Sequence, residues 1–479
     1  MKILSAASEL YPLVKTGGLA DVTGALPAAL AGEGIAVTNL VPGYPAVMAA
    51  LEKTAPFHAY KDLFGGPAQL IRGTAHGLDI IAIDAPHLFA RPGNPYLGKD
   101  GKDWPDNAQR FAALGKAAAD VAGGINKGYR ADLLHCHDWQ AALGPVYARF
   151  LGGPKSVMTV HNIAFQGQFP ASVFGLLGLP QQAFAIDGLE YYGNVGYLKG
   201  GLATADAITT VSPTYAQEIC TAEYGMGLDG LLRARRHLLR GIVNGIDTEV
   251  WNPATDSLIA ATYSAKSLKK REANKRALEA RFKLESGDGL LHGVVSRLTW
   301  QKGMDIFAAA LDHLVASGAR LALLGTGEAA IEAAILDAAT RHKGRIGVII
   351  GYDEALSHLM QAGADTILVP SRFEPCGLTQ LYGLRYGCVP VVARTGGLND
   401  TLIDANDAAL QAEVATGIQF APVDQPTLEH ALARAAECYS DSRLWRGLQK
   451  RGMEQDVSWA RSAAAYAQLY RNLVKARAS

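Results

Sequence analysis

Short apolar segments alternate with longer Ala- and Leu-rich segments along this chain of 479 residues. The apolar segments predict buried strands at residues 3–6, 36–41, 79–83, 133–137, 157–161, 207–211, 292–296, 320–324, 346–350, 366–369 and 389–393. Helical spacing of apolar residues is found between them, at 19–32, 107–122, 140–150, 214–223, 303–315, 328–342, 378–386 and 427–438. Nearly continuous apolar strands that alternate with helices predict a doubly wound α/β fold with parallel sheets.

More than ten strands would be unusual in one sheet, so we expect two Rossmann-like domains facing a deep cleft. We place the first domain at residues 1–243 and the second at 244–455. The remaining stretch, 456–479, contains a predicted helix that is expected to return to the first domain. Ligands of doubly wound folds bind outside the carboxyl ends of the strands. Residues that directly follow strands are therefore the candidates for function.

Charge and cysteine content narrow the classes of function. The 45 Lys and Arg residues balance 45 Asp and Glu residues, and a neutral surface argues against a dedicated nucleic-acid-binding protein. Five cysteines are too few, and odd in number, for a disulfide framework, which favours a reducing compartment. No stretch suits a signal peptide or a membrane span. These features predict a cytoplasmic protein that acts on neither nucleic acid nor membranes.

A lysine and two glycines follow the first predicted strand. Lys15, Gly17 and Gly18 precede a helix, and paired glycines at a helix N-terminus let backbone N–H groups approach an anion. Lys15 adds a full positive charge to this turn. The segment therefore predicts a binding loop, with an ordinary turn bearing a surface lysine as the alternative.

Two cations follow the first strand of the second domain. Arg297 and Lys302 stand at the start of the next helix, where a planar fork and a point charge would hold a diphosphate. Such a pair can stabilise a departing diphosphate without a metal, and the sequence has no Asp-x-Asp pair to carry Mg²⁺ or Mn²⁺. A solvated pair of charges is the alternative.

The most informative segment, residues 370–380, lies between an apolar strand and a helix. Pro375 holds Glu374 at the mouth of the predicted crevice, where the N–H groups of residues 376–378 would point at sugar hydroxyls and Thr379 at phosphate. A capped helix would explain Glu374 but not the Pro, Cys and Gly beside it. The cysteine of this segment is expected to be a small buried residue rather than a nucleophile.

Polar residues also follow two strands of the first domain. Asp138 and His161 are both expected at the carboxyl edge of its sheet, where they can touch a polar substrate. Strand alternation sends His135 and His137 to one face and Cys136 and Asp138 to the other, so a zinc site is not expected. For His135 and His137 we predict buried positions with satisfied hydrogen bonds.

Residues 325–330 match the G-x-G-x-x-A pattern of dinucleotide-binding folds. The motif follows the second strand of its domain rather than the first, and no acidic residue ends the next strand at the expected distance. It therefore predicts a nucleotide-contacting or packing turn, and a nicotinamide oxidoreductase is the weaker alternative.

The motifs at 15–21, 297–302 and 373–378 together closely resemble those of bacterial glycogen synthases and plant starch synthases. The resemblance covers essentially the whole chain and includes residues 135–140, 161–167, 243–247, 251–253 and 395–398. It implies the GT-B architecture and a retaining transfer of glucose from ADP-glucose to the non-reducing end of an α-1,4-glucan, in glycogen biosynthesis. It further implies no cofactor and no required metal, with ADP-glucose and glycogen as partners. A homo-oligomer is left open.

The resemblance also assigns residues. It implies that the catalytic residues are Lys15, His161, Arg297, Lys302 and Glu374. The donor would be bound by Gly17, Gly18, Asn162, Asn244, Tyr352, Cys376, Gly377, Leu378 and Thr379. Contacts with glucose or the acceptor would come from Asp21, Tyr96 and Asp138. Many retaining relatives carry a second Glu eight positions after the first, where this chain has Tyr382.

Other functions stay open from the residues alone. A transferase of the same architecture could use UDP- or GDP-sugars. A hydrolase could use Asp138 and Glu374 as paired carboxylates, and a silent carbohydrate-binding protein would bind glucan without extending it. For the synthase we expect an oxocarbenium-like transition state and front-face attack, because we identify no carboxylate to act as the nucleophile of a covalent intermediate.

Overall fold

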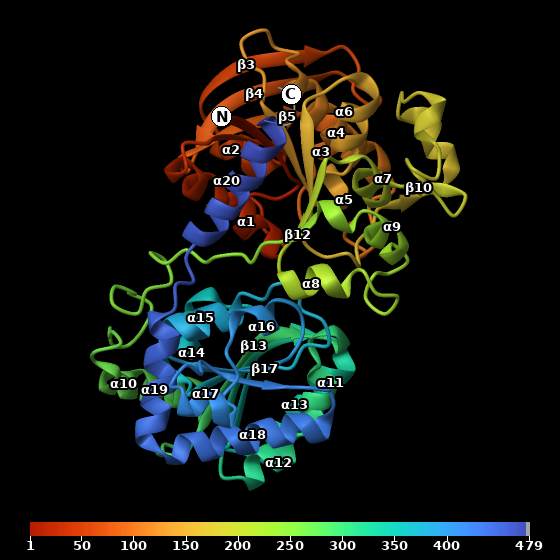
Figure 1. Cartoon of the computed structure of the whole chain (residues 1–479). Coiled ribbons are helices and arrows are strands. Elements are labelled where there is room, and N and C mark those ends of the chain that lie inside the picture. Colours follow the sequence, from red (N-terminus) through yellow and green to blue (C-terminus); the bar gives the residue numbers. More distant parts are fainter. Residues whose placement is uncertain (476–479) are drawn as a thin grey trace. The chain divides into compact units, whose positions relative to one another are not determined.

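The computed structural model describes residues 1–475. The chain divides into two compact units (Figure 1). The first unit contains Met1–Asn244 and the segment from Trp459 onward, and the second contains Gly245–Ser458. The first unit is therefore built from two separate stretches of sequence, with the whole second unit inserted between them.

A nine-stranded sheet with strand order β12-β11-β7-β6-β1-β2-β5-β4-β3 forms the centre of the first unit. Its strands are β1 (Lys2–Ala6), β2 (Ala36–Pro42), β3 (Glu52–Tyr60), β4 (Ala68–Ala75), β5 (Leu78–Asp84), β6 (Leu133–His137), β7 (Lys155–Val160), β11 (Ala207–Thr210) and β12 (Leu239–Gly241). β3 and β4 pair antiparallel, and so do β4 and β5. The prediction of a purely parallel sheet is therefore wrong at this edge, because a hairpin that the apolar pattern does not reveal extends the sheet.

A small antiparallel sheet is formed between β7 and β11 in the chain and is separate from the main sheet. It consists of β8 (Gln168–Phe169), β10 (Asn194–Gly196) and β9 (Glu190–Tyr191), in that order. Two 3-10 helices, η1 (Ala171–Leu176) and η2 (Gln181–Ala183), lie between β8 and β9 in the chain. This insertion separates β7 from the next helix of the doubly wound pattern.

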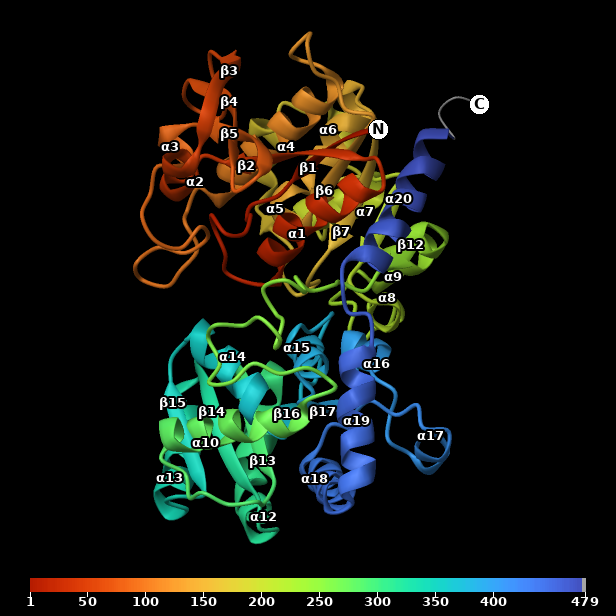
Figure 2. The same cartoon turned by 90° about the vertical axis from the view of Figure 1, so that its left-hand side faces the viewer.

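The helices of the first unit come from both of its sequence stretches. They are α1 (Gly18–Gly32), α2 (Pro45–Ala50), α3 (Pro86–Phe89), α4 (Asn107–Gly123), α5 (Asp138–Ala141), α6 (Leu143–Leu151), α7 (Tyr197–Thr204), α8 (Pro213–Glu218), α9 (Asp229–Ala234), η3 (Arg236–Leu238) and α20 (Ala460–Lys475). α20 lies beside α1 (Figure 2). Its Tyr466 and Tyr470 are buried in one cluster with Ile3, Val22 and Leu26, so the last helix completes this core.

The second unit has a six-stranded parallel sheet with strand order β15-β14-β13-β16-β17-β18. Its strands are β13 (Leu291–Leu298), β14 (Arg320–Gly327), β15 (Ile346–Ile350), β16 (Thr366–Val369), β17 (Val389–Ala393) and β18 (Ile418–Phe420). The bounds of β15, β16 and β17 confirm the prediction at 346–350, 366–369 and 389–393. β13 and β14 run a few residues further than predicted, so that Arg297 lies within a strand.

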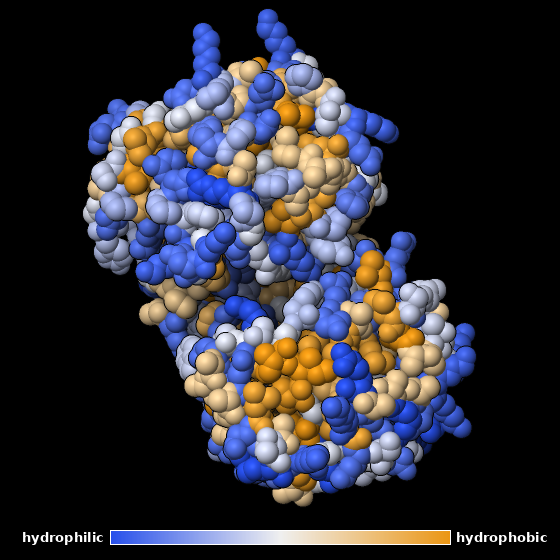
Figure 3. Space-filling view, turned by 180° about the vertical axis from the view of Figure 1, so that it is seen from behind, coloured by the Kyte–Doolittle hydropathy of each residue, from blue (hydrophilic) through white to orange (hydrophobic). Residues whose placement is uncertain are grey.

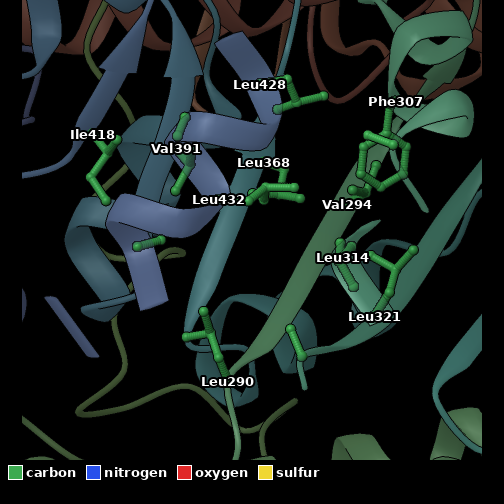
Figure 4. Packing of buried hydrophobic residues seen from close by; sticks show 14 of the residues in the cluster. Leu290, Val294, Phe307, Leu314, Leu321, Leu368, Val391, Ile418, Leu428 and Leu432 are labelled. Carbon is green, nitrogen blue, oxygen red and sulfur yellow. The ribbon is translucent and has the colours of Figure 1, made fainter. Parts of the chain in front are cut away.

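Helices cover both faces of this sheet. They are η4 (Leu268–Lys270), α10 (Arg271–Phe282), η5 (Trp300–Lys302), α11 (Met304–Ala309), α12 (Leu311–Ala316), α13 (Ala329–Arg341), α14 (Glu354–Gly363), α15 (Thr379–Tyr386), α16 (Gly396–Thr401), α17 (Asp407–Gln411), α18 (Gln425–Ser440) and α19 (Ser442–Glu454). Figure 4 shows Phe307 of α11 and Leu428 of α18 in one cluster with Val294 and Leu321. The next residue along β14, Ala322, joins a second cluster with α10 and α14, as the alternation of side chains along a strand requires.

Apolar surface is unevenly distributed in the second unit. Figure 3 shows apolar residues gathered into a patch on one side of it. β15 is an edge strand of the sheet, and its last residue, Ile350, is 39% exposed. None of the helices within residues 1–475 is both long and apolar enough to cross a membrane.

Candidate active site

The predicted binding loop of the first unit connects β1 to α1. Lys15 is exposed, and its ammonium group forms an ion pair with Asp21 in the first turn of α1, with Nζ 2.8 Å from Oδ1. Gly17 is the N-cap residue of α1 and makes no side-chain capping hydrogen bond of its own. The structure thus brings together Lys15, Gly17, Gly18 and Asp21, all of which the sequence had suggested.

A carboxylate that the sequence reasoning did not select lies beneath this loop. Glu9 accepts hydrogen bonds from the backbone N–H groups of Thr16, at 2.5 Å, and Gly17, at 3.3 Å. It also accepts one from the Tyr96 hydroxyl at 2.5 Å. Burial, followed by the charge of Glu9, holds the pKa of Tyr96 well above its ordinary value. Tyr96 is therefore a neutral donor tied to the same loop.

Asp138 and His161 meet at the carboxyl edge of the main sheet, as predicted. Asp138 directly follows β6 and has a positive φ of 54°. Its Oδ1 accepts hydrogen bonds from the backbone N–H groups of His161, at 2.7 Å, and Asn162, at 3.5 Å. Burial raises the pKa of Asp138 to about 7. A carboxyl group that titrates near neutral pH therefore lies beside His161 and Asn162.

The histidine rings near this edge are neutral. Burial lowers the pKa of His161 to about 3 and that of His135 to about 3. His161 Nε2 is hydrogen-bonded to His137 Nδ1 at 3.0 Å, and His137 Nε2 lies 3.3 Å from Ser5 Oγ. His135 is hydrogen-bonded to Thr159 and, at 2.7 Å, to the hydroxyl group of Tyr470 in α20. The predicted buried and satisfied positions of His135 and His137 are confirmed.

The pKa of Asp138 leads to a testable pH dependence. The ionised carboxylate accepts hydrogen bonds from substrate hydroxyls better than the neutral acid does. We therefore expect kcat/KM to rise with pH through about 7, and we expect Asp138→Asn to abolish this step. The measurement is kcat/KM between pH 5 and 9, in wild type and variant.

The pH dependence of the free energy of unfolding also reports on the titration of Asp138. The pKa of Asp138 is raised from 3.8 to about 7 in the folded protein, so the stability linked to its neutral form is fully present below pH 3.8 and is lost as the pH rises through 7. Asp138→Asn should therefore gain stability relative to wild type as the pH rises from about 4 to about 7, and this gain should level off above pH 7. A difference in melting temperature that does not change with pH would contradict the assignment.

The second unit holds a lysine and a glutamate in direct contact. Lys302, in η5 after β13, places Nζ 2.5 Å from Oε2 of Glu374, and their side chains are 17% and 10% exposed. The Ser371 hydroxyl donates to the same Glu374 oxygen at 2.9 Å. Arg297, near the end of β13, is exposed, and its Nη2 lies 3.5 Å from Oε1 of Gln301. A partly buried ion pair and an exposed cation thus occupy the carboxyl edge of this sheet.

The loop that carries Glu374 is shaped by its neighbours. Gly397 donates its N–H to the Glu374 carbonyl oxygen at 3.1 Å, and a Cβ atom at position 397 would lie 2.1 Å from the carbonyl oxygen of Cys376. Gln380 donates from Nε2 to the carbonyl oxygens of Cys376, at 3.1 Å, and Gly377, at 2.8 Å. Gln380, which was not selected from the sequence, therefore holds the turn that precedes α15.

Residues predicted to bind the donor lie around this turn. Cys376 is buried, as expected, and Gly377 has a φ of 71°. Leu378 is the N-cap residue of α15, and Thr379 is its first residue. The structure thus brings these residues together with Glu374 at one helix N-terminus, where backbone N–H groups and the helix dipole favour oxygen ligands.

Two further predicted residues stand apart from these groups. Tyr352 follows β15, is 74% exposed, and donates its hydroxyl to Glu354 at 2.9 Å. Asn244, the last residue of the first long stretch of unit 1, is buried. Its Oδ1 has no hydrogen-bond partner among residues 1–475. An acceptor that is buried without a partner destabilises the fold.

The dinucleotide-like turn has a packing role. Glu332 of α13 accepts from the Thr326 hydroxyl at 2.8 Å and from the Gly327 N–H at 2.6 Å. A Cβ atom at Gly325 would lie 2.1 Å from the carbonyl oxygen of Ser296, so this glycine lets β13 and β14 approach. Within residues 1–475, no cluster of three or more His, Cys, Asp or Glu side chains could hold a metal ion.

Family models match both halves of the chain. The model described as the starch synthase catalytic domain matches residues 2–234, and that of group 1 glycosyl transferases matches residues 277–446. A curated glycogen synthase of Rhodopseudomonas palustris (strain BisA53) is 58% identical, over 100% of this chain and 98% of its own. One of Novosphingobium aromaticivorans is 59% identical, over 99% of both chains.

Solved structures give the same result. The catalytic domain of starch synthase IV from Arabidopsis thaliana, bound to ADP and acarbose, has a TM-score of 0.89 and 34% identity, with 99% of both chains covered. The sucrose-phosphate synthase of Thermosynechococcus elongatus has a TM-score of 0.58 and 18% identity, over 99% of both chains, and supports the two-domain GT-B fold alone. The identity to the curated relatives over essentially the full length places this chain in the family of the bacterial glycogen synthases and plant starch synthases, which are glucosyltransferases.

Proposed function

We propose that this protein transfers glucose from ADP-glucose to the non-reducing end of an α-1,4-glucan, with retention of the anomeric configuration, during glycogen synthesis in the cytoplasm. The observation that carries the proposal is the Lys302–Glu374 pair beside Arg297 at the carboxyl edge of the second sheet. It provides cations for a diphosphate and a carboxylate for sugar hydroxyls within one loop cluster. Membership of the family and the ADP bound to starch synthase IV support the choice of donor.

The second unit is assigned to the donor. Arg297 and Lys302 neutralise the diphosphate as the bond to glucose breaks, and Glu374 accepts hydrogen bonds from glucose hydroxyls. Thr379 and the N–H groups at the start of α15 support these contacts. Residues with the same assignment are Cys376, Gly377 and Leu378, while Tyr352 stacks on the base. Tyr352 is 74% exposed, so its ring is accessible to the base.

The first unit is assigned to the sugar and the acceptor. Lys15 adds positive charge near the donor phosphate, and the loop at Gly17 and Gly18 meets the donor sugar. His161, Asn162 and Asn244 contact the donor sugar, and the contacts of Asp21, Tyr96 and Asp138 are with glucose or acceptor. His161 suits this role because its low pKa, caused by burial, keeps the ring neutral, so that it exchanges hydrogen bonds with hydroxyls.

The proposed chemistry needs no metal and no covalent intermediate. The bond from glucose C1 to the ADP oxygen breaks with its electrons going to ADP, and positive charge develops on the sugar ring. The acceptor 4-hydroxyl attacks C1 from the same face, and its proton passes to the departing phosphate oxygen. Fixed positive charge at the diphosphate lowers the energy of this transition state.

The test is a panel of nucleotide sugars. Purified protein is mixed with glycogen and ADP-, UDP- or GDP-glucose, and nucleotide release is followed along with proton NMR of the first linkage formed. We expect fastest release from ADP-glucose and a new α-1,4 linkage. Preference for UDP- or GDP-glucose would refute the donor assignment. Shortening of the glucan without any nucleotide would indicate a hydrolase instead.

A further inference from the structure

Glu9 is a heavily engaged carboxylate of the first unit. Glu9 is only 3% exposed, yet its two carboxylate oxygens accept four hydrogen bonds from three residues. Oε2 accepts from the N–H groups of Thr16 and Gly17, at 2.5 and 3.3 Å. Oε1 accepts from the hydroxyls of Thr16 and Tyr96, at 2.6 and 2.5 Å. The carboxylate is therefore fully occupied by the loop and by a tyrosine far away in sequence.

The backbone of Glu9 is held by a hydrogen bond as well. Thr23 of α1 donates its hydroxyl to the Glu9 carbonyl oxygen at 2.9 Å. The neighbouring Ser8 hydroxyl lies 2.8 Å from the Tyr96 hydroxyl. Glu9 therefore sits in a rigid frame that joins α1, the glycine loop and Tyr96.

This arrangement changes what the glycine loop can bind. Successive backbone N–H groups form a concavity that attracts anions, but here the N–H groups of Thr16 and Gly17 are taken by a carboxylate of the chain itself. A phosphate placed at the same N–H groups would meet the negative charge of Glu9. Lys15 still provides a positive charge in this loop, and its ammonium group forms an ion pair with Asp21.

We propose that Glu9 is a positioning residue that acts as the internal anion of the glycine loop. It holds Thr16, Gly17 and Tyr96 in place and excludes phosphate from the loop N–H groups. The loop then binds neutral sugar hydroxyls, and Lys15 binds the phosphate. This inference rests on the proposed function for its kinetic consequence, but the exclusion of phosphate can be measured without turnover.

The experiment compares Glu9→Gln with wild type and with Glu52→Gln, a change of an exposed glutamate in β3. An amide of nearly the same shape offers one acceptor oxygen instead of two and carries no charge. Because misplaced binding groups slow catalysis, kcat/KM for ADP-glucose should fall about 10- to 100-fold. Without the carboxylate charge, inorganic phosphate should bind about tenfold more tightly or better. Glu52→Gln should change neither value.

Phosphate binding is measured by calorimetry on the full-length protein, so inactivity of the wild type with ADP-glucose would count against the proposed function alone. Unchanged phosphate affinity in Glu9→Gln would overturn the role of internal anion. If Glu9→Gln does not fold, the double variant Thr16→Val, Tyr96→Phe removes both hydroxyl donors while the carboxylate stays. That variant should lose kcat/KM with no gain in phosphate affinity, and an unchanged kcat/KM would overturn the positioning role.

Discussion

Replacing Lys302 by alanine is expected to lower kcat about 10²-fold, because one fixed charge-stabilising donor contributes about 3 kcal/mol to a transition state of this kind. The ammonium group lies at the carboxyl edge of the sheet, in contact with Glu374, where we place the departing diphosphate. Affinity for the glucan should change far less than turnover. The measurement is steady-state kinetics with ADP-glucose and glycogen, with Lys343→Ala, an exposed lysine of the same unit, as the matched control.

The same substitution also leaves Glu374 without its cation. A buried charge that loses its partner destabilises the fold, so part of the defect could be structural. The double variant Lys302→Ala, Glu374→Gln separates the two effects. We expect it to recover the melting temperature lost in Lys302→Ala but not the turnover. Recovery of turnover together with stability, or a single variant within a few-fold of wild type, would contradict a role in charge stabilisation.

Gly303→Ala is expected to cause the second large loss, in both stability and activity. Gly303 has a φ of 67°, and a Cβ atom there would lie 2.0 Å from the carbonyl oxygen of Pro370. The left-handed conformation alone costs a non-glycine residue about 1–2 kcal/mol. The overlap adds a further ~1–3 kcal/mol as the turn is forced away from the end of β16. Since Lys302 precedes this glycine, kcat should fall as well.

Gly318→Ala is the matched control for this prediction. Gly318 also has a positive φ, of 87°, but a Cβ atom there would meet nothing within 4 Å. It should therefore show the conformational cost without the overlap and without a loss of turnover. Melting temperatures and kcat of the two variants measure the difference. Equal losses at both positions would show that the contact with Pro370 does not hold the Lys302 turn in place.

The second unit was the more predictable from sequence. Its strands are nearly continuous apolar runs covered by helices on both faces, so β15, β16 and β17 were predicted with their observed bounds. In the first unit, β3 has the sequence EKTAPFHAY and is largely exposed. A half-exposed antiparallel strand with charges and a proline does not stand out by hydrophobicity, and the hairpin was missed.

The candidate site was predictable where a residue directly follows a strand. Asp138 and His161 come together because the carboxyl ends of β6 and β7 are adjacent in the sheet. The role of Glu9 could not be predicted, because its hydroxyl partner Tyr96 is 87 positions away along the chain. Periodicity carries no information on such pairs. The catalytic and binding roles of the selected residues stay predictions until the variants are measured.

The placement of α20 has a consequence for how the protein is made. The helix supplies Tyr466 and Tyr470 to the core of the first unit, but a ribosome completes Ala460–Lys475 only after it has made all of Gly245–Ser458. Domains generally fold as units during synthesis, the N-terminal one first. Here the order is reversed, because the first unit cannot close its core until α20 has been made, while all of the second unit is made before α20.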